Sequence, residues 1–103
     1  MKLSVAESLT GGKIASTIVS VPGASAYFSG GFVAYSRVMK EQLLGVSKTT
    51  IDQFSVVSQE VAQEMATLTR DKTRSDYAIA VTGNAGPSKD LSLIHISEPT
   101  RPY

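Results

Sequence analysis

The chain has 103 residues, of which 42% are hydrophobic, and this length and composition suit one domain with one core. Its formal net charge of +1, with acidic and basic residues interspersed, excludes recognition of nucleic acid or an anionic membrane by bulk charge. With no cysteine and one histidine, disulfides, thiol catalysis and a His- or Cys-based metal cluster are excluded. The apolar stretches are far shorter than the ~20 residues of a membrane span, and no secretory signal is recognised, so we expect a cytoplasmic protein with no metal and no cofactor.

The first predicted elements are a strand, a glycine-rich turn and a helix. Residues 3–5 form an apolar run typical of a buried parallel strand, and the turn follows in the sequence Ala6-Glu7-Ser8-Leu9-Thr10-Gly11-Gly12. The helix predicted over residues 11–20 presents four apolar side chains on one face: Ile14, Ala15, Ile18 and Val19. Glycines at a helix N-terminus leave backbone N–H groups that suit a phosphate or a carboxylate. The simpler alternative is a turn of small residues that binds nothing.

A second strand is predicted over residues 28–35, where Phe32, Val33 and Tyr35 favour extended backbone. Gly30 and Gly31 lie inside this segment and indicate a bulge or a close approach of a neighbouring strand.

Two short helices are predicted next. Ser36 can cap a helix that runs through Leu44 and ends at Gly45, because a serine often precedes a helix and a glycine often follows one. Thr50 and Gln53 fit a capping box, which predicts one further helical turn.

A longer helix and a third strand complete the pattern. Ser58 can cap a helix that extends to about Lys72, with four apolar residues on its inner face: Val61, Ala62, Met65 and Leu68. Residues 77–81 read as a second buried strand, and residues 82–87 as a second glycine-rich loop at its exit. Strands that alternate with helices indicate an α/β layered fold around a largely parallel sheet. Both glycine-rich turns then lie at the carboxyl ends of strands, where binding sites gather.

The last residues depart from this pattern. Residues 91–103 follow the second glycine-rich loop with no helix to pack on, and they end in a proline-rich stub. The string LIHISEPTRPY also resembles the translation of a sequencing-adaptor read-through. We therefore interpret residues 91–103 as a non-native tail, and the alternative is a genuine short strand.

Four segments together resemble one family. The segments AESLTGG, VPGASAYFSGGFVAYSRVMKEQLLGV, VVSQEVAQEMA and AVTGNAGP, in this order, resemble the C-terminal domain of the competence/damage-inducible CinA family. The resemblance covers residues 3–88 and implies a three-layer α/β/α sandwich on a mostly parallel, mixed sheet. It also implies that residues 1–90 are a partial domain, truncated at both ends, that lacks a helix before the first strand and the strands after the second glycine-rich loop.

The resemblance also implies an activity, because single-domain members of this family are nicotinamide-nucleotide amidases. The expected reaction is hydrolysis of nicotinamide mononucleotide to nicotinate mononucleotide and ammonia, within pyridine nucleotide salvage. The partner is then a small nucleotide, with no nucleic acid and no membrane, and homo-oligomerisation stays open. We expect the truncated chain itself to be partly folded and inactive. The alternative, suggested by the family name, is a non-catalytic interaction module in competence or DNA-damage responses.

The catalytic residues follow from the same resemblance, with Ser25 as the nucleophile and Lys40 as its base. A lysine whose pKa is about 10.4 acts as a base near neutral pH only if burial or a nearby cation lowers its pKa toward ~7–8. Tyr35 closes a strand and Lys40 lies about one turn into the next helix, so both are expected at the rim that carries the first glycine-rich turn. Tyr35 then donates to the serine oxygen or relays a proton. Without the resemblance, Ser25 reads as a turn former and Lys40 as a solvated side chain.

Residues of both glycine-rich segments are candidates for holding the nucleotide. They are Glu7, Ser8, Thr10, Gly11, Gly12, Thr82 and Gly83. Asn84 departs from the apolar residue that the family usually has in the second loop. Which of the two loops takes the phosphate stays open.

Overall fold

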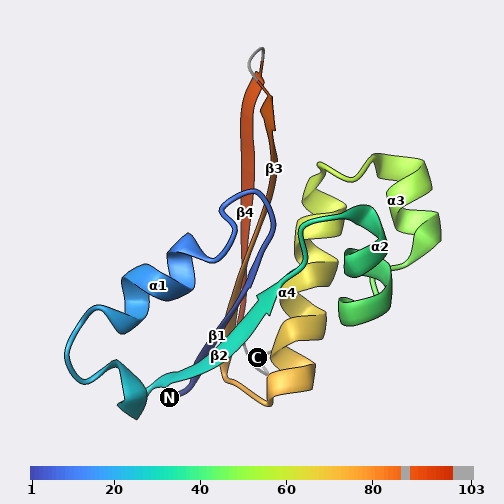
Figure 1. The fold of residues 1–103 in the computed structure, drawn as a ribbon. Helices are drawn as coiled ribbons and strands as arrows, with labels where there is room; N and C mark the ends of the chain where they lie inside the picture. The colour runs from blue at the N-terminus through green and yellow to red at the C-terminus, as the bar shows by residue number, and fades with distance from the viewer. Residues whose placement is uncertain (87–88, 99–103) are drawn as a thin grey trace.

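A computed structural model of the protein describes residues 1–86 and 89–98. Figure 1 shows a sheet with helices on its two sides. The elements in chain order are β1 (Leu3–Glu7), α1 (Lys13–Val19), the 3-10 turn η1 (Ala24–Ala26), β2 (Phe28–Val33), α2 (Arg37–Met39), the π-helical turn η2 (Lys40–Leu44), α3 (Lys48–Phe54), α4 (Gln59–Thr73), β3 (Tyr77–Gly86) and β4 (Lys89–Ser97).

The sheet is mixed, with the strand order β2-β1-β3-β4. The central strand β1 pairs in parallel with β2 and with β3, whereas β3 and β4 pair antiparallel. Figure 1 shows α1 on one side of this sheet and α2, α3 and α4 on the other. The expected α/β fold with a mostly parallel, mixed sheet between helices is confirmed.

The core lies between the sheet and α4. Ala6 of β1 and Ala80 of β3 are neighbours across the parallel ladder, and both belong to one buried cluster with Val61 and Met65 of α4. Leu44 at the end of η2 belongs to the same cluster. Small residues on the strands let the helix approach the sheet closely, and the large side chains of α4 fill the space between them.

The helix that the sequence predicted from residue 58 is confirmed. The Ser58 hydroxyl accepts a hydrogen bond from the Val61 N–H, and α4 then runs to Thr73. Val61, Ala62 and Met65 are buried and Leu68 is partly buried, as the apolar pattern predicted. The short helix after Ser36 is also confirmed: the Ser36 hydroxyl accepts from the Met39 N–H, and Gly45 ends η2 with a positive φ.

Two predictions about local structure are wrong. The capping box at Thr50 does not form, because α3 already begins at Lys48 behind Ser47 and Thr50 lies inside the helix. The prediction of a second glycine-rich loop is wrong for residues 82–86, which continue β3. The cause is the antiparallel partner strand, which pairs with β3 as far as Gly86 opposite Lys89 and so extends its ladder. Residue 87 of that loop lies outside the described residues.

The segment expected to be a separate tail is part of the sheet as far as residue 97. Residues 89–97 form β4, which pairs with β3 and contacts α4, so the expectation that no helix packs on it is wrong. Ile94 and Ile96 are 60% and 58% exposed on this edge strand. Whether the segment is native concerns the gene and stays a prediction, and residues 99–103 lie outside the described part of the chain.

The predicted close approach of strands occurs at Gly31. This residue pairs with Val5 of β1, and a Cβ at Gly31 would collide with the Val5 carbonyl oxygen. A bulge also occurs here, because Leu3 pairs with Phe28 whereas Ser4 pairs with Gly30. Position 31 therefore requires glycine because β1 and β2 lie too close together for a side chain, and not because of the backbone conformation of Gly31.

We expect the substitution Gly31→Ala to lower the free energy of unfolding by about 1–3 kcal/mol, since the added methyl group forces β2 away from the backbone of β1. Urea unfolding measures the change. The matched control is Ser29→Ala at the exposed bulge residue two positions earlier, which should leave the urea midpoint within experimental error. Equal midpoints for the two variants would show that the strands separate without cost.

Candidate active site

Lys40 is a buried lysine at the carboxyl ends of β1 and β2. Its side chain is 1% exposed, and its Nζ donates three hydrogen bonds. The acceptors are the Ser8 Oγ at 2.8 Å, the Ala34 carbonyl oxygen at 3.1 Å and the Tyr35 carbonyl oxygen at 3.1 Å. Lys40 also begins the π-helical turn η2, a widened geometry that is frequent at functional sites. The lysine thus joins the turn after β1 to the end of β2.

Burial lowers the pKa of Lys40, because the interior disfavours the charged ammonium form. Among the described residues, no carboxylate lies within ion-pair distance of its Nζ to offset that effect. A lysine in this environment holds a neutral amine at a lower pH than a solvated lysine does. The neutral amine can accept a proton from the hydroxyl beside it, which is the chemistry required of a base.

The first glycine-rich turn is organised around the Glu7 carboxylate, which is fully buried. Its Oε1 accepts from the Thr10 hydroxyl at 2.6 Å and from the N–H groups of Gly12 at 3.2 Å and Ile14 at 2.9 Å. Its Oε2 accepts from the Ala15 N–H at 2.8 Å. The turn therefore binds a carboxylate, as its composition allowed, and the carboxylate belongs to the chain itself.

Two further amides, at the end of this turn and the start of α1, also have acceptors within the chain. The Gly11 N–H donates to the Ser8 carbonyl and the Lys13 N–H to the Thr10 carbonyl, each at 3.1 Å. All five amides from residue 11 to residue 15 are thus engaged inside the protein. Thr10 lines a hollow of about 280 Å³ along α1, together with Lys13 and Ile14.

The pKa of Glu7 is shifted by opposing effects. Burial raises it, but the hydrogen bond from the Thr10 hydroxyl and those from the Ala15, Ile14 and Gly12 amides lower it by more, so the net pKa lies below 4.5. The carboxylate is therefore ionised at neutral pH and serves as an internal anion at the start of α1.

Ser25 lies at the other end of the sheet from Lys40. It is an exposed residue of η1, beside a hollow of about 340 Å³, and the chain enters β2 directly after it. The Leu3 N–H donates to the Tyr27 carbonyl at that entrance, whereas the Ala34 N–H donates to the Glu7 carbonyl at the exit. The six residues of β2 span roughly 20 Å at the usual rise of a strand. One chain therefore does not bring Ser25 and Lys40 together.

Tyr35, Thr82 and Gly83 lie near the rim that carries Lys40. Tyr35 contributes its backbone carbonyl to Lys40, while its side chain is 70% exposed. Thr82 is buried, and its hydroxyl donates to the Val56 carbonyl at 3.3 Å. Continuing the parallel register of β1 and β3 places Thr82 beside Ser8. The structure thus gathers Ser8, Lys40 and the two β3 residues at one edge.

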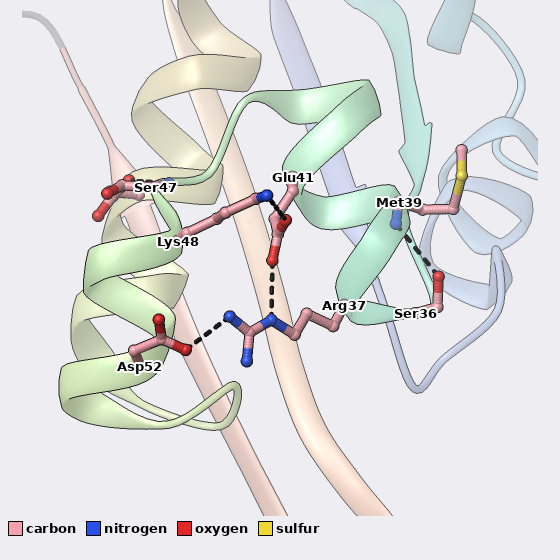
Figure 2. Close-up of polar contacts among 8 residues, drawn as sticks. Ser36, Arg37, Met39, Glu41, Ser47, Lys48 and Asp52 are labelled. Carbon is pink, nitrogen blue, oxygen red and sulfur yellow. Dashed lines mark hydrogen bonds and ion pairs between the residues drawn. The ribbon is translucent and has the colours of Figure 1, made fainter.

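A surface ion-pair network holds the segment that carries Lys40 against α3 (Figure 2). The Arg37 Nε lies 2.7 Å from the Glu41 Oε2, and the Arg37 Nη2 lies 2.6 Å from the Asp52 Oδ1. These contacts, the hydrogen bond to Glu41 foremost, raise the pKa of Arg37. Lys48 lies 4.0 Å from Glu41 on the same surface. Exposed pairs contribute little to stability, so this network chiefly orients α2.

The part of the chain that the structure describes contains no cluster of three or more metal-ligating His, Cys, Asp or Glu side chains. No helix in that part is both long and apolar enough to span a bilayer.

The fold and this edge define an α/β protein with a buried serine and lysine in contact where two parallel strands end. The family model of the CinA C-terminal domain matches residues 1–93, and the chain belongs to this family. A "CinA-like protein" of Flavobacterium psychrophilum is 55% identical over 89 residues, which cover 86% of this chain and 21% of that protein. A "putative competence-damage inducible protein" of Levilactobacillus brevis is 51% identical over 87 residues, or 84% of this chain and 21% of that protein.

Solved structures of the same superfamily share the fold. A CinA superfamily protein of Escherichia coli superposes with a TM-score of 0.84 and 28% identity, covering 98% of this chain and 69% of that one. The competence/damage inducible protein CihA of Agrobacterium tumefaciens gives a TM-score of 0.83 and 33% identity, covering 93% of this chain and 69% of that one. The chain thus spans about a fifth of these curated relatives and about seven tenths of these solved proteins.

Proposed function

We propose that the protein is an amidohydrolase that converts nicotinamide mononucleotide to nicotinate mononucleotide and ammonia by a metal-free Ser/Lys mechanism. The observation that carries this proposal is the Lys40 amine, which is buried, has a lowered pKa and lies 2.8 Å from the Ser8 hydroxyl, so that it can act as a base at this edge of the sheet. Such an amine can take a proton from a hydroxyl that attacks the carboxamide carbon and can return it to the departing nitrogen. Membership of the CinA family supports the substrate through the resemblance described above.

The assignment of Ser25 as nucleophile and Tyr35 as proton donor belongs to the proposal and rests on the same resemblance. Because one chain holds Ser25 and Lys40 at opposite ends of β2, we expect a second copy of the protein to bring its Ser25 to Lys40. The exposure of Ser25 and of the Tyr35 side chain is compatible with contacts between copies.

The test is ammonia release from nicotinamide mononucleotide. It compares the chain as it stands with a form extended at both ends, from its own gene, to the length of the solved relatives; we call this form the extended protein. We expect turnover by the extended protein, no turnover by the chain alone, and no loss of rate with a chelator. Inhibition by the chelator that added metal reverses would contradict the metal-free mechanism.

The alternative is a non-catalytic interaction module, which the names of the relatives as competence- or damage-inducible proteins favour. An extended protein that is folded, as judged by a cooperative thermal transition, but releases no ammonia from nicotinamide mononucleotide would favour the module. Retained partner binding after substitution of both Ser25 and Lys40 would point the same way.

A further inference from the structure

The outer edge of β2 is free of any neighbouring strand. β2 stands first in the strand order β2-β1-β3-β4, so it pairs with β1 on one side and, among the described residues, with no strand on the other. In Figure 1 it is the turquoise arrow at the margin of the sheet. A free edge presents a row of backbone N–H and C=O groups, which can pair with a further extended strand.

The backbone groups at this edge are located by the ladder between β2 and β1. The Ala34 N–H donates to the Glu7 carbonyl at 2.8 Å, so Ala34 turns its backbone toward β1. Successive residues of a strand turn their N–H and C=O groups to opposite edges, so Val33 and Gly31 turn theirs away from β1. The bulge at the start of β2 does not disturb this alternation, because the register is regular from Gly30 onward.

The edge also lacks the charges that usually protect such strands. No charged residue occurs between Lys13 and Arg37, a stretch that includes η1 and all of β2. Natural edge strands are commonly blocked by lysine, by other charged side chains or by proline, and β2 contains none of these. An uncharged edge can meet an identical edge without repulsion between like charges. The β2 edge is therefore compatible with a second copy of itself.

Exposed apolar side chains lie near both ends of β2. Val19 and Val21 are 59% and 52% exposed, and they share a hollow of about 340 Å³ with Phe28, the first residue of β2. At the other end, Val33 and Tyr35 are 47% and 70% exposed. Two identical strands related by a two-fold axis run antiparallel, so the start of one lies beside the end of the other. Each apolar end then faces the other apolar end of the second copy.

From these features we infer that β2 is the contact between two copies of this protein. The two β2 strands pair antiparallel about a two-fold axis, through the backbone of Gly31 and Val33, and join the two sheets into one. A two-fold contact is complete after two copies, so the assembly is a dimer. This inference rests on the edge and does not depend on the amidase activity. It also brings η1 of one copy toward the end of β2 in the other, which is the relation that a site shared between Ser25 and Lys40 requires.

The first experiment measures the mass of the extended protein by analytical ultracentrifugation over a range of concentrations. We expect a dimer that dissociates on dilution. Val33→Lys puts a positive charge on each of the two facing edges, so it should raise the Kd of the dimer by about a hundredfold or more. The matched control is Phe54→Lys, which changes an apolar side chain of α3 that is 43% exposed, against 47% for Val33, and should leave the Kd unchanged.

Three results of this experiment would overturn the inference. They are a protein that stays monomeric at every concentration, an open series of species larger than a dimer, and a dimer that Val33→Lys leaves intact. The open series is expected instead if β2 pairs head-to-tail with the opposite edge of the sheet, because such a contact does not close after two copies.

Amide hydrogen exchange gives a readout that needs no substitution. In the dimer the Val33 and Gly31 amides should exchange slowly, and they should become fast when the protein is diluted below its Kd. The Ala34 amide is the matched control, since its bond to the Glu7 carbonyl lies within one chain and should keep it slow in both states. Fast exchange at Val33 in a dimer would overturn the inference even if Val33→Lys failed to fold. A dimer with a protected Val33 amide that releases no ammonia would contradict only the proposed function.

Discussion

The substitution Lys40→Met in the extended protein is expected to lower kcat by about 10²–10⁴-fold, the usual contribution of a general base. Methionine has a similar length and keeps the site filled, but it cannot accept a proton. The exposed lysine of α3 supplies the matched control, Lys48→Met, which should keep the normal rate. Initial rates of ammonia release at saturating nicotinamide mononucleotide give the comparison, and equal rates for both variants would remove Lys40 from the mechanism.

The same variant should change how stability depends on pH. The pKa of folded Lys40 lies below 10.5, so between the two values the unfolded chain binds more protons than the folded one and stability rises with pH. Lys40→Met lacks this rise.

A mixing experiment tests whether two copies share the site. If Ser25 is the nucleophile, Ser25→Ala should be as inactive as Lys40→Met. Mixing the two inactive variants should then restore part of the rate when copies exchange. Continued inactivity of a mixture shown to contain hetero-oligomers would contradict a site shared between copies.

The second large effect is expected at Glu7. The substitution Glu7→Gln keeps the shape of the side chain but removes its charge and turns an amide N–H₂ toward backbone donors, so we expect the free energy of unfolding to fall by about 2–3 kcal/mol. The matched control is Glu60→Gln in the first turn of α4, an exposed glutamate also near a helix start, whose change should be small. Urea unfolding at neutral pH measures both, and a similar loss for the two variants would contradict a special role for Glu7.

Acid should reproduce the effect of the substitution in the unchanged protein. The folded-state pKa of Glu7 lies below the value of 4.5, so the stability that its carboxylate provides is complete above that pH. It is lost as pH falls below 4.5 through the folded-state pKa, where the carboxyl becomes protonated in the folded protein. Glu7→Gln should show a shallower loss of stability over this range, and parallel curves would exclude Glu7 as the cause.

The elements that could be predicted from the sequence are those whose signals are local. Ser58 as a helix cap and the apolar spacing of α4 depend on residues within a few turns of one another, and both were predicted correctly. Residues 82–86 were predicted as a loop because glycine and asparagine disfavour strands. Pairing with β4 outweighs that preference, and a partner strand is a tertiary feature that local composition does not encode.

In the candidate site, too, features set by local sequence were predicted and features set by tertiary structure were not. The prediction that Lys40 reaches the rim of the first glycine-rich turn agrees with its contact to Ser8, since both residues closely follow parallel strands. The pairing itself was missed, although Ser8 directly after β1 and Lys40 one turn beyond β2 were a usable signal. The separation of Ser25 from Lys40 follows from β2 running between them, and the strand predicted over residues 28–35 already implied it. The engagement of Glu7 with α1 depends on side-chain orientation and was not predictable.

The Glu7 carboxylate also affects whether the first glycine-rich turn can bind an anion from solution. A group tethered to its own binding site acts at a high effective concentration, which for short flexible links is in the millimolar range or above. A phosphate from solution must compete with this internal ligand for the Gly12, Ile14 and Ala15 amides, and the internal ligand incurs no entropy loss of association. The turn is therefore held in shape by a carboxylate of its own chain, which already occupies the amides of Gly12, Ile14 and Ala15.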